Sequence, residues 1–242
     1  MKQRIAIVMG ATSGIGREVA LLLAQKGWTV GVAGRRKEKL DELLKVEGIQ
    51  AAKQIDVTQP DAPALLQELI DEMGGMQLYF HSSGIGYQNY MLDTDKEMRT
   101  VETNGMGFTR MVNAAFQYFT QHQGHIACIS SIAGTKGLGA APAYSATKRF
   151  QNHYLECLTQ LANMRHIPVK ITDIRPGFVA TDLIKDGSYP MQLTAPQVAR
   201  EIVEGLEKGK SIITVDWKYR ILVFFWRLIP RFLWIRLKIK TK

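Results

Sequence analysis

Short apolar runs alternate with longer amphipathic stretches along most of this 242-residue chain. The apolar runs have the length and composition of strands, and they occupy residues 5–9, 28–33, 49–57, 78–80, 125–130, 169–174 and 211–215. Several stretches between them repeat apolar residues at helical spacing, which predicts helices at residues 15–26, 37–46, 62–73, 143–164 and 196–207. Strands that alternate with helices predict parallel βαβ units, and therefore an α/β fold with a doubly wound parallel sheet flanked by helices.

Neither a repeat nor a low-complexity linker interrupts this pattern before Asp216, so we expect one domain at residues 1–216 and a tail at residues 217–242. Hydrophobic residues make up 46% of the chain and charged residues 22%, which excludes a disordered protein. The two cysteines, Cys128 and Cys157, cannot form a disulfide framework, and neither C-x-x-C nor a histidine cluster suggests zinc. We therefore expect a cytoplasmic protein without a bound metal.

A glycine-rich turn, Gly10-Ala11-Thr12-Ser13-Gly14-Ile15-Gly16, joins the first strand to the first helix. Glycines let the backbone turn tightly there and approach a pyrophosphate, which would lie at the N-terminus of the helix. The spacing differs from the general G-x-G-x-x-G fingerprint, and a plain connecting turn is the alternative. The strand–turn–helix context favours dinucleotide binding.

The end of the second strand indicates which dinucleotide is bound. An acidic residue at this place bonds to the ribose of NAD, whereas an arginine accommodates the 2′-phosphate of NADP. This chain has Gly34 there, followed by Arg35 and Arg36. Two solvated arginines at a helix start are the alternative, but with the acid missing the pair favours NADP(H), and NAD(H) is the second choice.

Tyr144 and Lys148 stand four residues apart and so share one face of the helix predicted at residues 143–164. A neighbouring cation stabilises a phenolate and lowers the pKa of a tyrosine, which makes the phenol a proton donor or acceptor near neutral pH. A lone pair of this kind more often decorates a helix surface, so its interpretation depends on other motifs.

Four further motifs accompany the glycine-rich turn and the Tyr-x-x-x-Lys pair, and together they resemble the short-chain dehydrogenase/reductase family in its single-domain, Rossmann-like form. They are Asp56-Val57, Asn104-Gly105-Met106-Gly107, Ser130-Ser131-Ile132-Ala133-Gly134, and Arg175-Pro176-Gly177 with Thr181. Ser131 precedes Tyr144 by 13 residues, which is the spacing of the family. The resemblance covers residues 3–216.

The resemblance implies that Tyr144 acts as general acid toward a carbonyl, and that Lys148 lowers its pKa and holds the nicotinamide ribose. It implies that Ser131 bonds to the substrate oxygen and that Asn104 holds a water linking Lys148 to solvent. It also implies a homodimer or homotetramer. The implied cofactor contacts are Gly10, Thr12, Ser13, Gly14, Ile15, Gly16, Arg35, Arg36, Asp56, Val57, Gly84, Tyr144, Lys148, Pro176, Gly177, Val179 and Thr181.

One departure follows the fourth strand, where the family usually has Asn-Asn-Ala-Gly. This chain reads His81-Ser82-Ser83-Gly84, which keeps Gly84. A histidine at a strand end is more often a hydrogen-bonded structural residue than a catalytic one, so we leave His81 out of the predicted site.

The tail carries nearly all of the net charge of +9. Residues 217–242 hold eight basic and no acidic residues, whereas the first 216 hold 23 basic and 22 acidic residues. Its longest apolar run, residues 221–226, is far shorter than the ~20 residues that span a bilayer, and Pro230 predicts two short helices. Aromatic residues mixed with cations favour peripheral contact with the inner face of a membrane; packing on the body or a second subunit is the alternative. Because the body is neutral, we expect no nucleic-acid partner.

The substrate is predicted from weaker signals. Leu138, Phe178, Leu183 and Tyr189 would border an apolar pocket under a short lid segment. With a tail that could face lipid, they favour a lipophilic ketone or secondary alcohol, such as a long-chain 3-keto lipid. The alternative is a catalytically idle NADP-binding redox sensor or membrane-associated scaffold, whose mark would be a lost Tyr or Lys; both residues are present.

Overall fold

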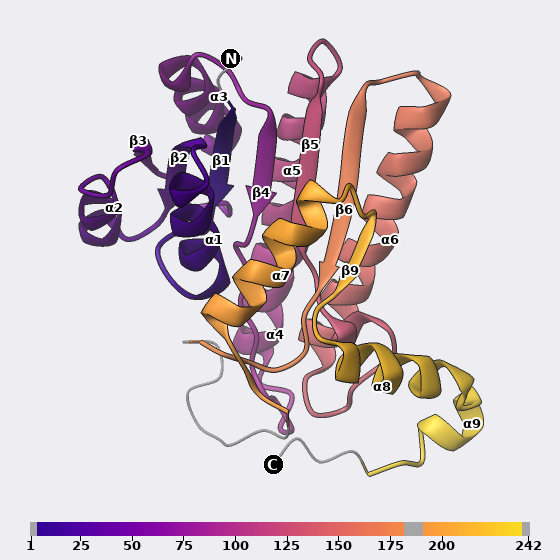
Figure 1. Cartoon of the computed structure of the whole chain (residues 1–242). Coiled ribbons are helices and arrows are strands. Elements are labelled where there is room, and N and C mark those ends of the chain that lie inside the picture. The colour runs from indigo at the N-terminus through magenta and orange to yellow at the C-terminus, as the bar shows by residue number, and fades with distance from the viewer. Residues whose placement is uncertain (1–3, 182–190, 239–242) are drawn as a thin grey trace.

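The computed structural model describes residues 4–181 and 191–238. Its central sheet contains β1 (Ile5–Met9), β2 (Thr29–Gly34), β3 (Ile49–Gln54), β4 (Leu78–His81), β5 (Gly124–Ile129), β6 (Val169–Arg175) and β9 (Ile212–Thr214). These seven strands are parallel in the order β3-β2-β1-β4-β5-β6-β9 (Figure 1). The predicted doubly wound sheet is thus confirmed. Strand order reverses between β1 and β4, and a ligand crevice is expected outside the carboxyl ends there.

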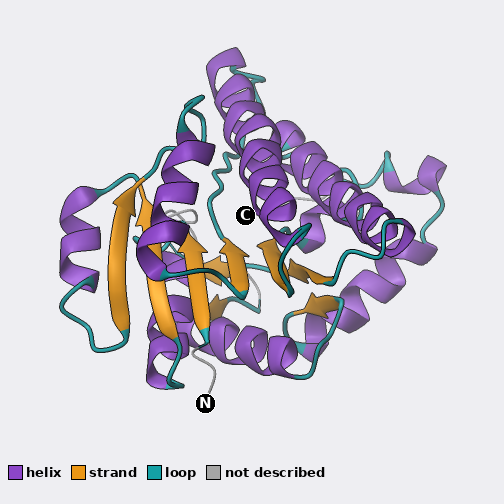
Figure 2. Ribbon diagram, turned by 90° about the horizontal axis from the view of Figure 1, so that it is seen from above, coloured by secondary structure: helices purple, strands orange, loops and turns teal. Residues whose placement is uncertain are grey.

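Helices cover both faces of the sheet (Figure 2). The helices α1 (Gly14–Gln25), α2 (Lys37–Leu43) and α7 (Ala195–Glu207) enclose one core with one face of the strands. The helices α3 (Ala62–Met73), α5 (Phe108–Phe119) and α6 (Pro142–Met164) enclose the other. The strand centres are apolar on both faces because both are buried.

A long helical stretch between β4 and β5 escaped the pattern analysis. It consists of α4 (Thr94–Val101), a π-helical segment η1 (Glu102–Gly107) and α5. Asp93 begins α4 by accepting hydrogen bonds from the N–H groups of Asp95 and Lys96. Shorter elements in the body are a 3₁₀ turn η2 (Ile132–Gly134) and the strand pair β7 (Val179–Ala180) and β8 (Leu193–Thr194).

The tail forms α8 (Trp217–Leu228) and α9 (Arg231–Trp234), so the two short helices predicted on either side of Pro230 are confirmed. One side of the tail packs on the body, because Tyr219, Val223 and Trp234 are buried. The indole Nε1 of Trp234 donates to the carbonyl of Gly137 at 2.7 Å. Within residues 4–181 and 191–238, none of the helices is both long and apolar enough to cross a membrane.

Candidate active site

The glycine-rich turn lies against two other loops at the carboxyl end of the sheet. Gly10 has φ of +86°, and a Cβ there would lie 2.7 Å from the backbone nitrogen of Ser83. A Cβ on Gly14 would lie 3.1 Å from Cγ2 of Thr181, so the segment after β6 closes over the turn. Backbone alone fits this crevice, and the N-terminus of α1 faces it, so the residues present fit a dinucleotide pyrophosphate.

The end of β2 has room for glycine alone. A Cβ on Gly34 would lie 2.8 Å from Cγ2 of Thr12. The Nη2 atom of Arg36 donates to Thr12 Oγ1 at 3.0 Å and to Ser13 Oγ at 2.5 Å. Arg35 is exposed, and its carbonyl accepts from the side chain of Gln54. The Arg36 guanidinium, just before α2, thus lies beside the turn, and its donors suit a phosphate.

The remaining predicted cofactor residues lie around the same crevice. The Asp56 carboxylate accepts from the N–H and hydroxyl of Thr58 in the turn after β3. Val57 is buried, and its carbonyl accepts from Arg110 at 2.8 Å. A Cβ on Gly84 would lie 3.3 Å from Oδ1 of Asn104, so the loop after β4 runs directly past that residue.

Asn104 connects three elements from inside the π-helical segment. Its Nδ2 donates to the carbonyl of Ile85 at 2.7 Å, and its Oδ1 accepts from the Ile85 N–H at 2.9 Å. Nδ2 also lies 3.3 Å from the Thr147 hydroxyl on α6. Its backbone carbonyl accepts from Nε2 of Gln151 at 2.9 Å. Asn104, wholly buried, therefore ties the loop after β4 to α6.

Ser131, Tyr144 and Lys148 converge at the carboxyl ends of β5 and β6. Ser131 begins the η2 turn, where its hydroxyl accepts from the Ala133 N–H at 3.0 Å. Lys148 Nζ donates to the carbonyl of Ile129 at 3.0 Å and to Oε1 of Gln151 at 2.9 Å. The same nitrogen lies 5.6 Å from the centre of the Tyr144 ring.

The pKa values of this group follow from burial. Burial raises the pKa of Tyr144, and a hydrogen bond with Ser131 offsets only part of the rise. Burial lowers the pKa of Lys148 to about 8, and nearby Asp173 and Cys128 offset part of this fall. The lowered Tyr144 pKa predicted from the sequence is therefore wrong for this structure, because burial of the phenol outweighs stabilisation of its phenolate.

Two buried polar groups support the site. His81 is wholly buried, and its Nδ1 shares a 2.9 Å hydrogen bond with the Tyr79 hydroxyl. Burial lowers the His81 pKa to about 3, so the ring is neutral, in keeping with a structural role. On β6, the Asp173 carboxylate accepts from Asn152 at 2.9 Å and from Arg175 at 2.7 Å, which ties α6 to the end of β6.

Of the predicted substrate residues, Leu138 and Phe178 are partly buried, and Phe178 packs against the tail. Leu183 and Tyr189 lie outside the described residues. Tyr219 was not predicted from the sequence. Its hydroxyl accepts from the Phe178 N–H at 3.0 Å and donates to the Met191 carbonyl at 3.1 Å. A Cβ on Gly177 would overlap the Tyr219 ring, so the tail holds the segment that follows Pro176.

Comparisons with known proteins agree with this geometry. Residues 4–189 match the family model described as short chain dehydrogenase. An uncharacterized oxidoreductase of Myxococcus xanthus is 31% identical over 95% of this chain and 94% of its own length. Dehydrogenase/reductase SDR family member 7B of Bos taurus is 28% identical over 95% of this chain and 79% of its own.

Two solved structures share the fold. A short chain dehydrogenase from Burkholderia cenocepacia, in complex with NADP, has a TM-score of 0.84 at 18% identity and covers 98% of both chains. A short chain dehydrogenase/reductase from Burkholderia phymatum, in complex with NAD, has a TM-score of 0.82 at 19% identity, over 99% of this chain and 96% of that one.

Proposed function

The chain belongs to the short-chain dehydrogenase family, and on this premise we propose that it is an NADP-dependent oxidoreductase that interconverts a ketone and a secondary alcohol. The observation that carries the proposal is the convergence of Ser131, Tyr144 and Lys148 at one end of the crevice whose other end is the glycine-rich turn. A dinucleotide laid along this crevice would reach from the arginines after β2 to the phenol.

Each side chain has a defined task in the proposed reduction. A bound nicotinamide supplies the hydride. Tyr144 donates its phenolic proton to the carbonyl oxygen, and its raised pKa keeps that proton in place at neutral pH. Ser131 donates a hydrogen bond to the same oxygen and stabilises the charge that develops there. Lys148 holds the ribose and faces the Tyr144 ring.

Activity is tested with a panel of ketones and NADPH, comparing the wild type with Tyr144→Phe. We expect the variant to lose about 10²–10⁴-fold in kcat while its NADPH dissociation constant changes little. Equal turnover in both proteins would overturn the assigned role of the phenol.

NADP preference is supported by the lack of room for an acidic side chain at Gly34 and by the arginines that follow it. Fluorescence titration with NADPH and NADH tests it on the wild type, Arg35→Ala and Arg36→Ala. We expect each variant to bind NADPH about tenfold more weakly and NADH unchanged, with the exposed Lys39→Ala as control. If the folded wild type binds neither nucleotide, the scaffold alternative is favoured.

The tail supports a lipophilic substrate and peripheral membrane contact. At 100° per residue, Trp217, Ile221, Phe224 and Leu228 fall within about 60° of arc on α8. Trp217 is 59% exposed and Phe224 61%, whereas the opposite face of α8 is buried on the body. Basic residues flank the exposed stripe on both sides, namely Lys218, Arg220 and Arg227. Such a face suits an anionic lipid surface.

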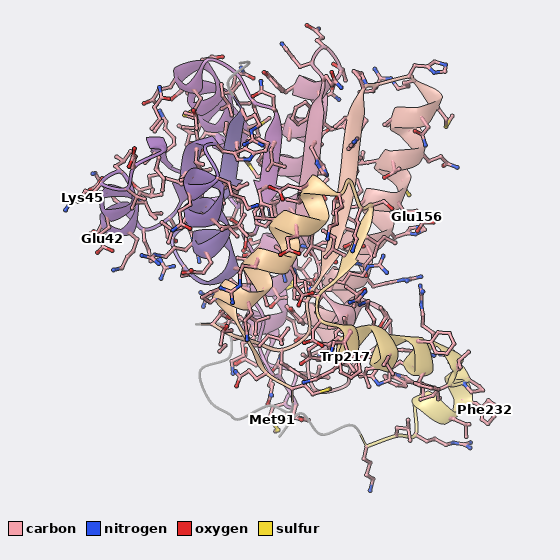
Figure 3. The ribbon with its side chains drawn as sticks, in the orientation of Figure 1. Glu42, Lys45, Met91, Glu156, Trp217 and Phe232 are labelled. Atoms are coloured by element: carbon pink, nitrogen blue, oxygen red, sulfur yellow. The ribbon has the colours of Figure 1, made fainter. Side chains whose placement is uncertain are left out.

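This exposed stripe lies at the end of the molecule that holds the active site. Trp217, Phe232 and Met91 occupy the lower end in Figure 3, toward which the carboxyl ends of the strands point in Figure 1. Met91 is 90% exposed and Phe232 is 58% exposed. A membrane contacting these side chains would lie beside the mouth of the site, where an acyl-chain ketone could enter.

Vesicle co-sedimentation tests the contact, using phosphatidylglycerol and phosphatidylcholine vesicles. We expect binding to the anionic vesicles that weakens with salt and falls at least tenfold in Trp217→Ala/Phe224→Ala. Exposed Phe150→Ala on α6 is the matched control. Equal sedimentation of wild type and double variant would reject the stripe as the contact, and self-association of the wild type alone would assign it to a second copy.

Faster turnover of small polar ketones than of acyl-chain ketones in detergent would reject the lipophilic substrate.

A further inference from the structure

Gln151 is a wholly buried side chain that contacts two parts of the site at once. Its Nε2 donates to the backbone carbonyl of Asn104, and its Oε1 accepts from Lys148 Nζ, each at 2.9 Å. Burying an amide is unfavourable unless its polar atoms are bonded. Here both ends are bonded, and one of them to the ammonium that the proposed function requires.

The orientation of the amide follows from its partners. The carbonyl of Asn104 can only accept a hydrogen bond, so the NH₂ end must face it. The ammonium of Lys148 can only donate, so the carbonyl end must face that group. A flipped amide would place two acceptors together at Asn104 and two donors together at Lys148. The Gln151 amide therefore has one orientation.

The π-helical segment makes the Asn104 carbonyl available. In a regular α-helix this carbonyl would accept from the N–H four residues later, that of Phe108. Here the Phe108 N–H donates instead to the carbonyls of Thr103 and Gly105. The π-helical turn thus leaves the Asn104 carbonyl without its usual helical donor, and the Gln151 side chain on α6 supplies a donor instead.

We propose that Gln151 is a positioning residue whose side-chain amide links Asn104 directly to Lys148, whereas the family resemblance implies a water that is held by Asn104 and links Lys148 to solvent. The inference rests on the proposed function, since it takes Lys148 as the catalytic ammonium. The amide fixes Nζ on the side of the helix that faces Tyr144 and stabilises its charged form through Oε1.

Other groups around Lys148 also affect its charge. Tyr144 lies on the same helix, His81 faces it from β4, Cys128 from β5 and Asp173 from β6. The neutral ring of His81 and the raised pKa of the Cys128 thiol leave Asp173 as the negative charge among these four at neutral pH. Substitutions at Gln151 leave all four groups in place, so a change in the Lys148 titration would report on the amide.

The test is the titration of Lys148 in the nucleotide-free protein, followed by NMR of ¹³C-labelled lysine and assigned with Lys148→Arg. Gln151→Met keeps the side-chain volume and removes both polar ends, whereas Gln151→Ala leaves space that a water can enter. We expect the Lys148 pKa to fall by about one unit in Gln151→Met and by less in Gln151→Ala. In Gln151→Glu the carboxylate should raise it. Exposed Gln160→Met on the same helix is the control.

The loss of turnover should rank the variants as the fall in the Lys148 pKa does. Gln151→Met should lose on the order of tenfold in kcat, and Gln151→Ala should lose less. A residue that only fills space would give the reverse order, because a cavity is more harmful than a volume-conserving change. That order, or an unchanged Lys148 pKa in the Met and Glu variants, would overturn the inference. If the wild type reduces no ketone, the proposed function fails while the titration still decides the bridge.

Discussion

Tyr219 provides the sharpest test of how the tail and the body are joined. Its side chain is wholly buried, its ring lies on Gly177, and its hydroxyl bridges the Phe178 N–H and the Met191 carbonyl. Tyr219→Phe keeps the ring and removes both hydrogen bonds. Losing these two hydrogen bonds costs about 2 kcal/mol, so Tm should fall by roughly 4–8 °C at this chain length.

Tyr219→Ala removes the ring as well. Truncating a buried aromatic side chain costs about 3–5 kcal/mol, which corresponds to a fall in Tm of roughly 6–20 °C. Urea unfolding followed by circular dichroism gives the free energies directly. Phe225→Ala, at a side chain 60% exposed on the same helix, is the matched control and should change stability by less than about 0.5 kcal/mol.

The reasoning would be refuted if Tyr219→Ala were as stable as Phe225→Ala, because the tail would then contribute nothing to the fold. It would also be refuted if Tyr219→Phe cost as much as Tyr219→Ala, since the hydroxyl would then account for the whole effect. NADPH affinity should weaken in Tyr219→Ala, as the segment after Pro176 loses its support.

Three further predictions concern the site. Burial lowers the Lys148 pKa to about 8, and the unfolded chain keeps this proton up to about pH 10.4. The unfolding free energy should therefore rise by about 2–3 kcal/mol between pH 8 and 10, a rise that urea titrations should not find in Lys148→Met. Gly34→Asp should weaken NADPH binding at least about tenfold without a gain for NADH, because the new Cβ would press on Thr12; fluorescence titration that finds tighter NADH binding would contradict this. Asp173→Ala should cost about 3–5 kcal/mol, since it leaves the partly buried Arg175 without its carboxylate partner; a loss below about 1 kcal/mol in urea unfolding would show that the pair is not needed.

The sheet could be predicted from sequence because each buried parallel strand is an apolar run between turn residues. The helix Ala62–Met73 has the bounds predicted from the sequence, because a proline near its start and a glycine after its end mark both ends. The helical stretch from Thr94 to Phe119 was not predicted, because the π-turn at its centre breaks the helical periodicity of its apolar residues. A local pattern of apolar residues therefore predicts regular helices and strands, but it does not predict segments whose backbone is irregular.

The closeness of Tyr144 and Lys148 was predictable from their spacing, because residues four apart share one face of a helix. Gln151 was missed although a signal existed: it lies seven residues after Tyr144, on the helix face that continues to buried Leu155, where a polar residue is unexpected. The bridge itself depends on the Asn104 carbonyl, 47 residues away in the chain, and a local pattern cannot show such a pair.

The π-helical segment has a consequence for how this chain tolerates changes in length. A π-turn holds one residue more than the α-turn it replaces, and the flanking helices keep their orientation around it. Shortening residues 102–107 by one would yield an uninterrupted helix from Thr94 to Phe119, still packed by both flanks, while the Asn104 carbonyl would return to its ordinary partner on the helix axis. One surplus residue therefore separates a regular helix from one whose Asn104 carbonyl is free to bond to Gln151, and a deletion that spares the fold would remove the proposed link to Lys148.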